Sequence, residues 1–74
     1  MKENYFIEIN GKIYISIWNE IIDNIRYHLL INQNNNSDIV VGSITDNKLI
    51  VEYDKDKLKK IIFKMIRNIR LFME

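Results

Sequence analysis

The sequence predicts an α+β domain with the element order β-β-α-β-β-α, in which a four-stranded antiparallel sheet carries two helices on one face. Three observations lead to this prediction. Two runs of aromatic and β-branched residues surround Asn10-Gly11, which is a strong signal for a two-residue hairpin turn. A second pair of such runs surrounds Asp46-Asn47. Each pair is followed by a stretch whose apolar residues recur at helical spacing.

The first half of the chain is expected to form a hairpin and then a helix. Strands are predicted over residues 5–9 and 12–16, because their side chains suit a pleated surface. The following helix begins at Ser16 or Asn19, either of which can cap it, and ends near Asn32. Its apolar stripe, at spacings of three and four, consists of Trp18, Ile21, Ile22, Ile25 and Leu29.

The middle of the chain is expected to form a loop and a second hairpin. Residues 34–38 are a polar tract of Asn, Ser and Asp, which is typical of an exposed loop. Strands are predicted over 39–45 and 48–53. Gly42 weakens the first of these strands and indicates a bulge or a close approach of another backbone segment.

A second helix is predicted from about residue 55 to near the C-terminus. Asp54 or Asp56 caps it and places negative charge at the positive end of the helix dipole. Its apolar residues follow the pattern i, i+3, i+4, i+7 and are Leu58, Ile61, Ile62, Met65, Ile66, Ile69, Phe72 and Met73.

The size of the chain predicts one domain over residues 1–74, built from two units of hairpin and helix over 4–33 and 38–74. A chain of 74 residues buries only about 60% of its unfolded surface, so its core is marginal. The sequence has no Cys, which excludes disulfides. Tight packing or self-association is therefore the expected source of additional stability.

Apolar residues are expected on both faces of the predicted sheet. Alternation places Ile7 and Ile9 on the face that meets the helices, and we assign Ile13 and Ile15 to the same face. The opposite face then carries Phe6, Tyr14 and Ile50. A solvated face should be polar, so this apolar cluster predicts an interface with a second copy or with another protein.

The charges are unevenly distributed along the chain. Residues 1–53 carry four basic and seven acidic side chains, whereas residues 54–74 carry seven basic and three acidic ones. Phosphate contacts with a nucleic acid are therefore possible on one side of the second helix, where Phe63 can stack on a base. The basic residues concerned are Lys57, Lys60, Lys64, Arg67 and Arg70.

No residue pattern in the sequence points to catalysis, a metal or a cofactor. His28 is the one histidine, and no nucleophile motif surrounds it. Asp54-Lys55-Asp56 resembles the start of a calcium loop but lacks the glycine and the closing glutamate. The two glycines do not form a phosphate-binding fingerprint. We therefore expect a protein that is not an enzyme.

These patterns favour a small protein-binding module, homodimeric and cytoplasmic, without a membrane segment. Ile, Asn and Lys have AT-rich codons and make up 34 of 74 residues, which suits a stoichiometric inhibitor from a phage or mobile element of an AT-rich bacterium. The alternative is a nucleic-acid-binding protein that uses the basic helix face. A third possibility is sequestration of a small phosphorylated ligand between subunits.

Overall fold

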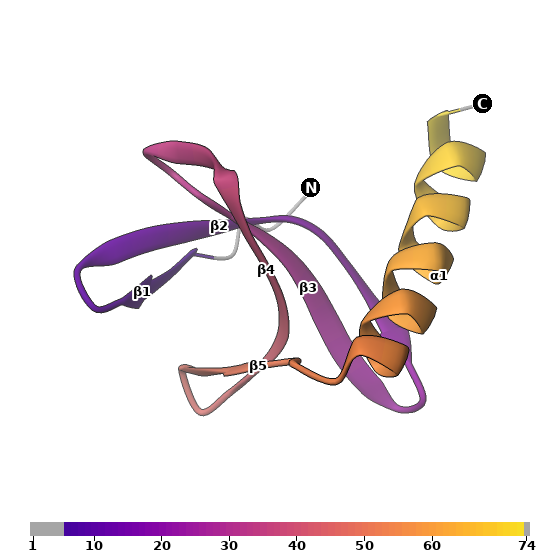
Figure 1. Ribbon diagram of the computed structural model, residues 1–74, viewed down its shortest axis with the longest axis horizontal. Helices are drawn as coiled ribbons and strands as arrows, with labels where there is room; N and C mark the ends of the chain where they lie inside the picture. Colours follow the sequence, from indigo (N-terminus) through magenta and orange to yellow (C-terminus); the bar gives the residue numbers. More distant parts are fainter. Residues whose placement is uncertain (1–5, 74) are drawn as a thin grey trace.

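A computed structural model describes residues 6–73 and contains one five-stranded antiparallel sheet and one helix (Figure 1). Strands that follow one another in the chain are neighbours in the sheet, which curls until it is nearly closed, with β1 in contact with β5. The prediction of four strands and two helices is therefore wrong. The elements are β1 (Phe6–Ile9), β2 (Lys12–Ile22), β3 (Ile25–Asn32), β4 (Asn35–Thr45), β5 (Lys48–Val51) and α1 (Lys55–Met73).

Short two-residue turns join the strands. Both turn residues have positive φ in three of the turns, as a type I′ hairpin requires. This confirms the hairpins predicted at Asn10-Gly11 and Asp46-Asn47, and the third such turn is Asp23-Asn24. The φ angles are 51° at Asn10, 79° at Gly11, 53° at Asp23, 68° at Asn24, 52° at Asp46 and 61° at Asn47.

The segment predicted as the first helix is instead the β2–β3 hairpin. The apolar residues that share helical spacing become direct cross-strand partners, with Trp18 opposite Leu29 and Ile22 opposite Ile25. The turn at Asp23-Asn24 reverses the chain between them, and the surrounding β-branched isoleucines favour the pleated conformation. The expected repetition of hairpin and helix is therefore absent from residues 6–73.

The polar tract 34–38 is also part of a strand, because β4 begins at Asn35. The connection from β3 is reduced to a tight turn at Gln33 and Asn34. The side chain of Asn32 fixes this turn by accepting a hydrogen bond of 2.9 Å from the Asn34 backbone N–H. Hydrogen bonds of this kind, between an Asn side chain and the nearby backbone, stabilise a tight turn where the composition of the segment suggests a longer loop.

The two faces of the sheet are covered in different ways. On the inner face of the curl, Ile7, Tyr14 and Leu30 form one buried cluster. On the outer face, α1 covers a second cluster whose buried members are Ile22, Tyr27, Val41, Ile61 and Met65. The curl of the sheet thus covers the face that carries Ile7, which the four-stranded fold would have left to the two helices.

The predicted assignment of side chains to faces needs a related correction. In the two-residue hairpin Ile9 lies opposite Lys12, and Ile7 therefore lies opposite Tyr14. Direct partners project to the same side of an antiparallel pair. Ile7 and Tyr14 consequently share the inner face, whereas Phe6 lies on the outer face opposite Ile15. Tyr5, the predicted first residue of this strand, is outside the described residues.

Gly42 marks a close backbone approach, as predicted. A Cβ atom at this position would lie 2.4 Å from the carbonyl oxygen of Ile50 and 3.0 Å from Cδ1 of Leu49. Only a residue without a side chain allows the backbone of β5 to approach β4 this closely. The glycine therefore helps the sheet to turn its last strand back toward β1.

The prediction of the C-terminal helix is confirmed, including its cap. Oδ1 of Asp54 accepts hydrogen bonds from the backbone N–H groups of Asp56 at 2.9 Å and Lys57 at 3.4 Å, the pattern of an N-cap. Ile61 and Met65 are buried against the outer face of the sheet. Figure 1 shows α1 beside the β2–β3 hairpin, on the opposite side of the molecule from β1.

Candidate binding surfaces

An apolar row crosses four strands on the outer face of the sheet. Phe6 lies opposite Ile15, Ile15 opposite Ile31, and Ile31 opposite Ile39. Because direct partners project to the same side, the four side chains form one continuous strip, which we call the outer row. Phe6 and Ile39 at its ends are 62% and 54% exposed, and the two central isoleucines are half-buried.

The helix packs on the outer face beside the outer row. The ring of Phe72, near the end of α1, makes an edge contact with Trp18, with centroids 5.8 Å apart. Trp18 lies opposite Leu29, two residues before Ile31 of the outer row on β3. The aromatic end of α1 thus reaches the position on the sheet next to the outer row.

The structure does not bring together the three predicted interface residues. Phe6 belongs to the outer row. Tyr14 faces the interior of the curled sheet and is buried. Ile50 is 58% exposed and lies on the outer side of β5 opposite Ser43, separate from the outer row. The other three row residues were not predicted. The register of the first hairpin places Ile15 opposite Phe6, whereas Ile31 and Ile39 join the row only through the pairings of β3 and β4.

Tyr14 takes part in a polar cluster at the end of the sheet near the β3–β4 turn. Its hydroxyl donates to Oδ2 of Asp38 at 2.6 Å, and the Asn32 side-chain amide donates to the same oxygen at 3.1 Å. These two bonds hold the pKa of the Asp38 carboxyl below its usual value. The bond to Asp38 raises the pKa of Tyr14. The cluster is a structural link between three strands.

Ser16 and His28 lie together on the inner face, where Ser16 Oγ and His28 Nδ1 are 2.9 Å apart. Burial lowers the pKa of His28, and the charge of Arg26 lowers it further. This pair was not predicted from the sequence, since twelve residues separate its members. His28 is only 3% exposed and Ser16 is half-buried, so we assign the pair a role in packing.

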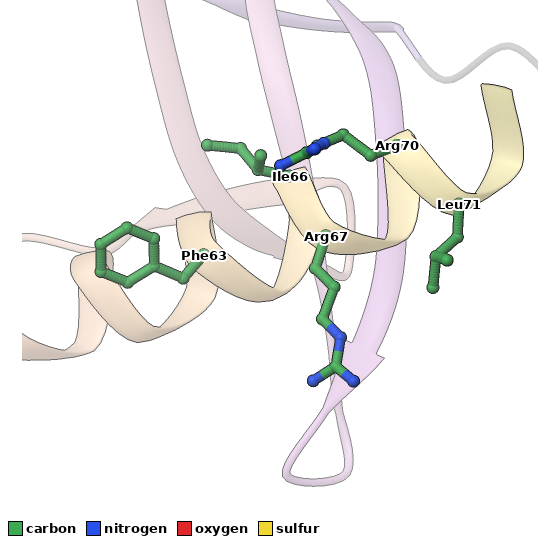
Figure 2. A pocket seen from close by; sticks show the side chains of 5 residues that line it. All are labelled: Phe63, Ile66, Arg67, Arg70 and Leu71. Atoms are coloured by element: carbon green, nitrogen blue, oxygen red, sulfur yellow. The ribbon is translucent and has the colours of Figure 1, made fainter. Parts of the chain in front are cut away.

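The solvent side of α1 carries a groove formed by two hollows, which we call the α1 groove. Phe63, which is 69% exposed, lines both of them. The first hollow, of about 300 Å³, is lined by Lys55, Leu58, Lys59, Ile62 and Phe63. The second, of about 330 Å³, is lined by Phe63, Ile66, Arg67, Arg70 and Leu71, and Figure 2 shows these five side chains projecting from the one helix.

The basic residues predicted to form one phosphate-binding stripe separate into two groups. Lys57 and Lys60 line a hollow between α1 and the β2–β3 turn, together with Asp23. Lys60 Nζ lies 2.7 Å from Asp23 Oδ2 and lowers the pKa of that carboxyl, with a smaller contribution from Lys64. Arg67 and Arg70 instead line the α1 groove.

Within residues 6–73, no group of three or more His, Cys, Asp or Glu side chains is arranged to hold a metal ion. In the same part of the chain, no helix combines the length and the apolar character needed to cross a membrane. Comparisons with family models, with curated proteins and with solved structures found no match.

Proposed function

We propose that this protein is a non-catalytic protein-binding module that self-associates through the outer row. The observation that carries the proposal is the continuity of Phe6, Ile15, Ile31 and Ile39 across four strands, with both ends of the strip exposed. Full burial of one such side chain contributes about 1.5–3 kcal/mol. A strip of this kind therefore favours a covered state in water.

The neutrality of the outer row supports a second copy as its occupant. The strip holds only aromatic and aliphatic side chains, so two copies can face one another without placing like charges in contact. Two sheets that pack face to face interdigitate their side chains at a separation of about 10 Å. The solvent side of α1 is a poor surface for self-association, because each copy would present Arg67 and Arg70 to the same residues of the other.

Sedimentation of the purified protein over a range of concentrations tests the proposal. We expect a monomer–dimer equilibrium for the native sequence and a monomer for Ile39→Lys. Ile21→Lys is a matched control, because Ile21 is 61% exposed and lies next to Ile22 in β2, facing the other side of the sheet. A native protein that is monomeric at every concentration, or a control that dissociates as readily as Ile39→Lys, would overturn the proposal.

Inhibition of a target protein by occupying its surface remains the role we propose for such a module. The nucleic-acid alternative draws support from Arg67 and Arg70, which flank Phe63 in the α1 groove. It is the weaker candidate, because aliphatic Ile66 and Leu71 line the same hollow. A sugar-phosphate backbone offers those side chains no apolar partner, whereas a protein partner does.

A further inference from the structure

The helix carries a second surface whose composition differs from that of the outer row. Its described residues include one acidic side chain, Asp56, which lies in the first turn. The basic side chains of α1 are Lys55, Lys57, Lys59, Lys60, Lys64, Arg67 and Arg70. Lys60 is paired with Asp23, but no acidic side chain lines either hollow of the α1 groove.

We propose that the α1 groove binds an acidic amphipathic helix of another protein. The inference rests on the proposed protein-binding function, but it uses no residue of the outer row. Charge complementarity identifies the partner, because four cationic side chains (Lys55, Lys59, Arg67 and Arg70) line the two hollows. A second copy of this chain would bring the same cations to the interface and repel.

The apolar part of the groove explains why the partner is a protein segment with apolar residues. The lining of the first hollow is almost wholly apolar and includes Leu58 and Ile62 as well as two lysines. The second places Ile66 and Leu71 beside the two arginines. Apolar anchors set in a groove with a charged rim are the arrangement by which helices are recognised.

The spacing of the hollows favours a helical partner. The residues that line them are centred about eight positions apart along α1, which corresponds to about 12 Å at 1.5 Å per residue. In a second helix, residues i and i+7 project from the same face and lie about 10.5 Å apart. Two apolar residues at this spacing can enter the hollows on either side of Phe63, while neighbouring carboxylates meet the cations.

The probe is a synthetic helical peptide of about 18 residues, with leucines at i, i+3, i+4 and i+7, glutamates flanking this stripe and alanines at the remaining positions. A second peptide has glutamine in place of every glutamate, and single-stranded oligothymidylate serves as the nucleic-acid competitor. Fluorescence anisotropy at low and moderate salt measures binding to the full-length protein. We expect the acidic peptide to bind at least about tenfold more tightly than the glutamine peptide, with an affinity that falls as salt is added.

Two variants locate the binding surface. Phe63→Ser and the double substitution Arg67→Glu/Arg70→Glu should each weaken binding of the acidic peptide at least about tenfold. Lys12→Glu/Lys48→Glu makes the same change in net charge on exposed strand residues and should leave the affinity within about twofold. Circular dichroism checks that every variant is folded, which we expect because Phe63, Arg67 and Arg70 are exposed.

Three results would overturn the inference: no binding of the acidic peptide at low salt, equal loss of affinity in the Lys12→Glu/Lys48→Glu control, or tighter binding of the oligothymidylate. The Ile39→Lys variant separates this inference from the proposed self-association. It should be monomeric and still bind the acidic peptide. Loss of peptide binding in this folded variant would contradict an independent α1 groove.

Discussion

The hydroxyl of Tyr14 donates a hydrogen bond of 2.6 Å to Oδ2 of Asp38, which lies 24 residues further along the chain. Tyr14 belongs to β2 and Asp38 to β4, so the bond passes across β3, which lies between these strands. Asn32 of β3 donates to the same oxygen. One carboxylate therefore connects the three central strands of the sheet at the end near the β3–β4 turn.

Replacing Tyr14 by Phe should destabilise the protein without altering its fold. The ring remains in the inner cluster, but Asp38 loses its shortest hydrogen bond. Urea unfolding should show a lower midpoint with an unchanged slope, since the surface exposed on unfolding is the same. Tyr53→Phe is the control, because the Tyr53 side chain is exposed, and an equal loss in that variant would argue against the Tyr14–Asp38 bond.

The cluster of Tyr14, Asn32 and Asp38 predicts that the stability of the protein depends on pH. Hydrogen bonds from Tyr14 and Asn32 lower the pKa of Asp38 in the folded protein below its ordinary value of 3.8. The folded state therefore releases this proton more readily than the unfolded state. The stability that this supplies is complete above the ordinary aspartate pKa and is lost as the pH falls through the lower folded pKa.

Asp38→Asn removes this titration and provides the comparison. At neutral pH the variant should unfold at lower urea concentration than the native protein. The difference should shrink as the pH is lowered below about 4. A difference that stays constant from pH 7 down to pH 2.5 would show that the Asp38 carboxylate is not stabilised by its neighbours.

The β2–β3 turn gives a test of the fold itself. Asn24 has a φ of 68°, a region that glycine enters freely and that costs a residue with a Cβ about 1–2 kcal/mol. Asn24→Gly should therefore keep or increase the free energy of unfolding, and Asn24→Ala should lower it by about 1 kcal/mol. The order would be reversed if this segment were a helix, in which alanine is favoured over glycine.

Gly42→Ala should destabilise the protein strongly for its size. The new methyl group would lie 2.4 Å from the Ile50 carbonyl oxygen, which belongs to the backbone. Overpacking of this kind costs about 1–3 kcal/mol. Ser43→Ala in the same strand is the control and should change stability by less than about 0.5 kcal/mol. Equal thermal unfolding midpoints for Gly42→Ala and Ser43→Ala would contradict the close approach of β5 to Gly42.

The sequence was most informative where one signal dominated. Asn10-Gly11 has no competing interpretation, and the apolar period of residues 58–73 continues for four turns without Gly or Pro, so the first hairpin and the C-terminal helix were both predicted. The β2–β3 hairpin was missed because Trp18, Ile22, Ile25 and Leu29 are spaced so that cross-strand pairing and helical periodicity give the same pattern. The turn at Asp23-Asn24 is the local signal that distinguishes the two.

The candidate surfaces were predicted in part. Arg67 and Arg70 were identified from helical charge patterning, but their separation from Lys57 and Lys60 depends on where Asp23 lies. The outer row depends on pairings between β2, β3 and β4, and therefore on the hairpin that was missed. Phe6 was identified because its position depends only on the first hairpin.

Intermolecular NOEs between isotope-labelled and unlabelled copies test the outer row most directly. At concentrations where sedimentation detects dimers, the aromatic protons of Phe6 and the methyl groups of Ile15, Ile31 and Ile39 should show contacts between copies. The methyl groups of Leu30, which face the interior, should show none. Dimers whose intermolecular contacts lie on α1 or on the Ile21 side of β2, with none from the outer row, would contradict the account.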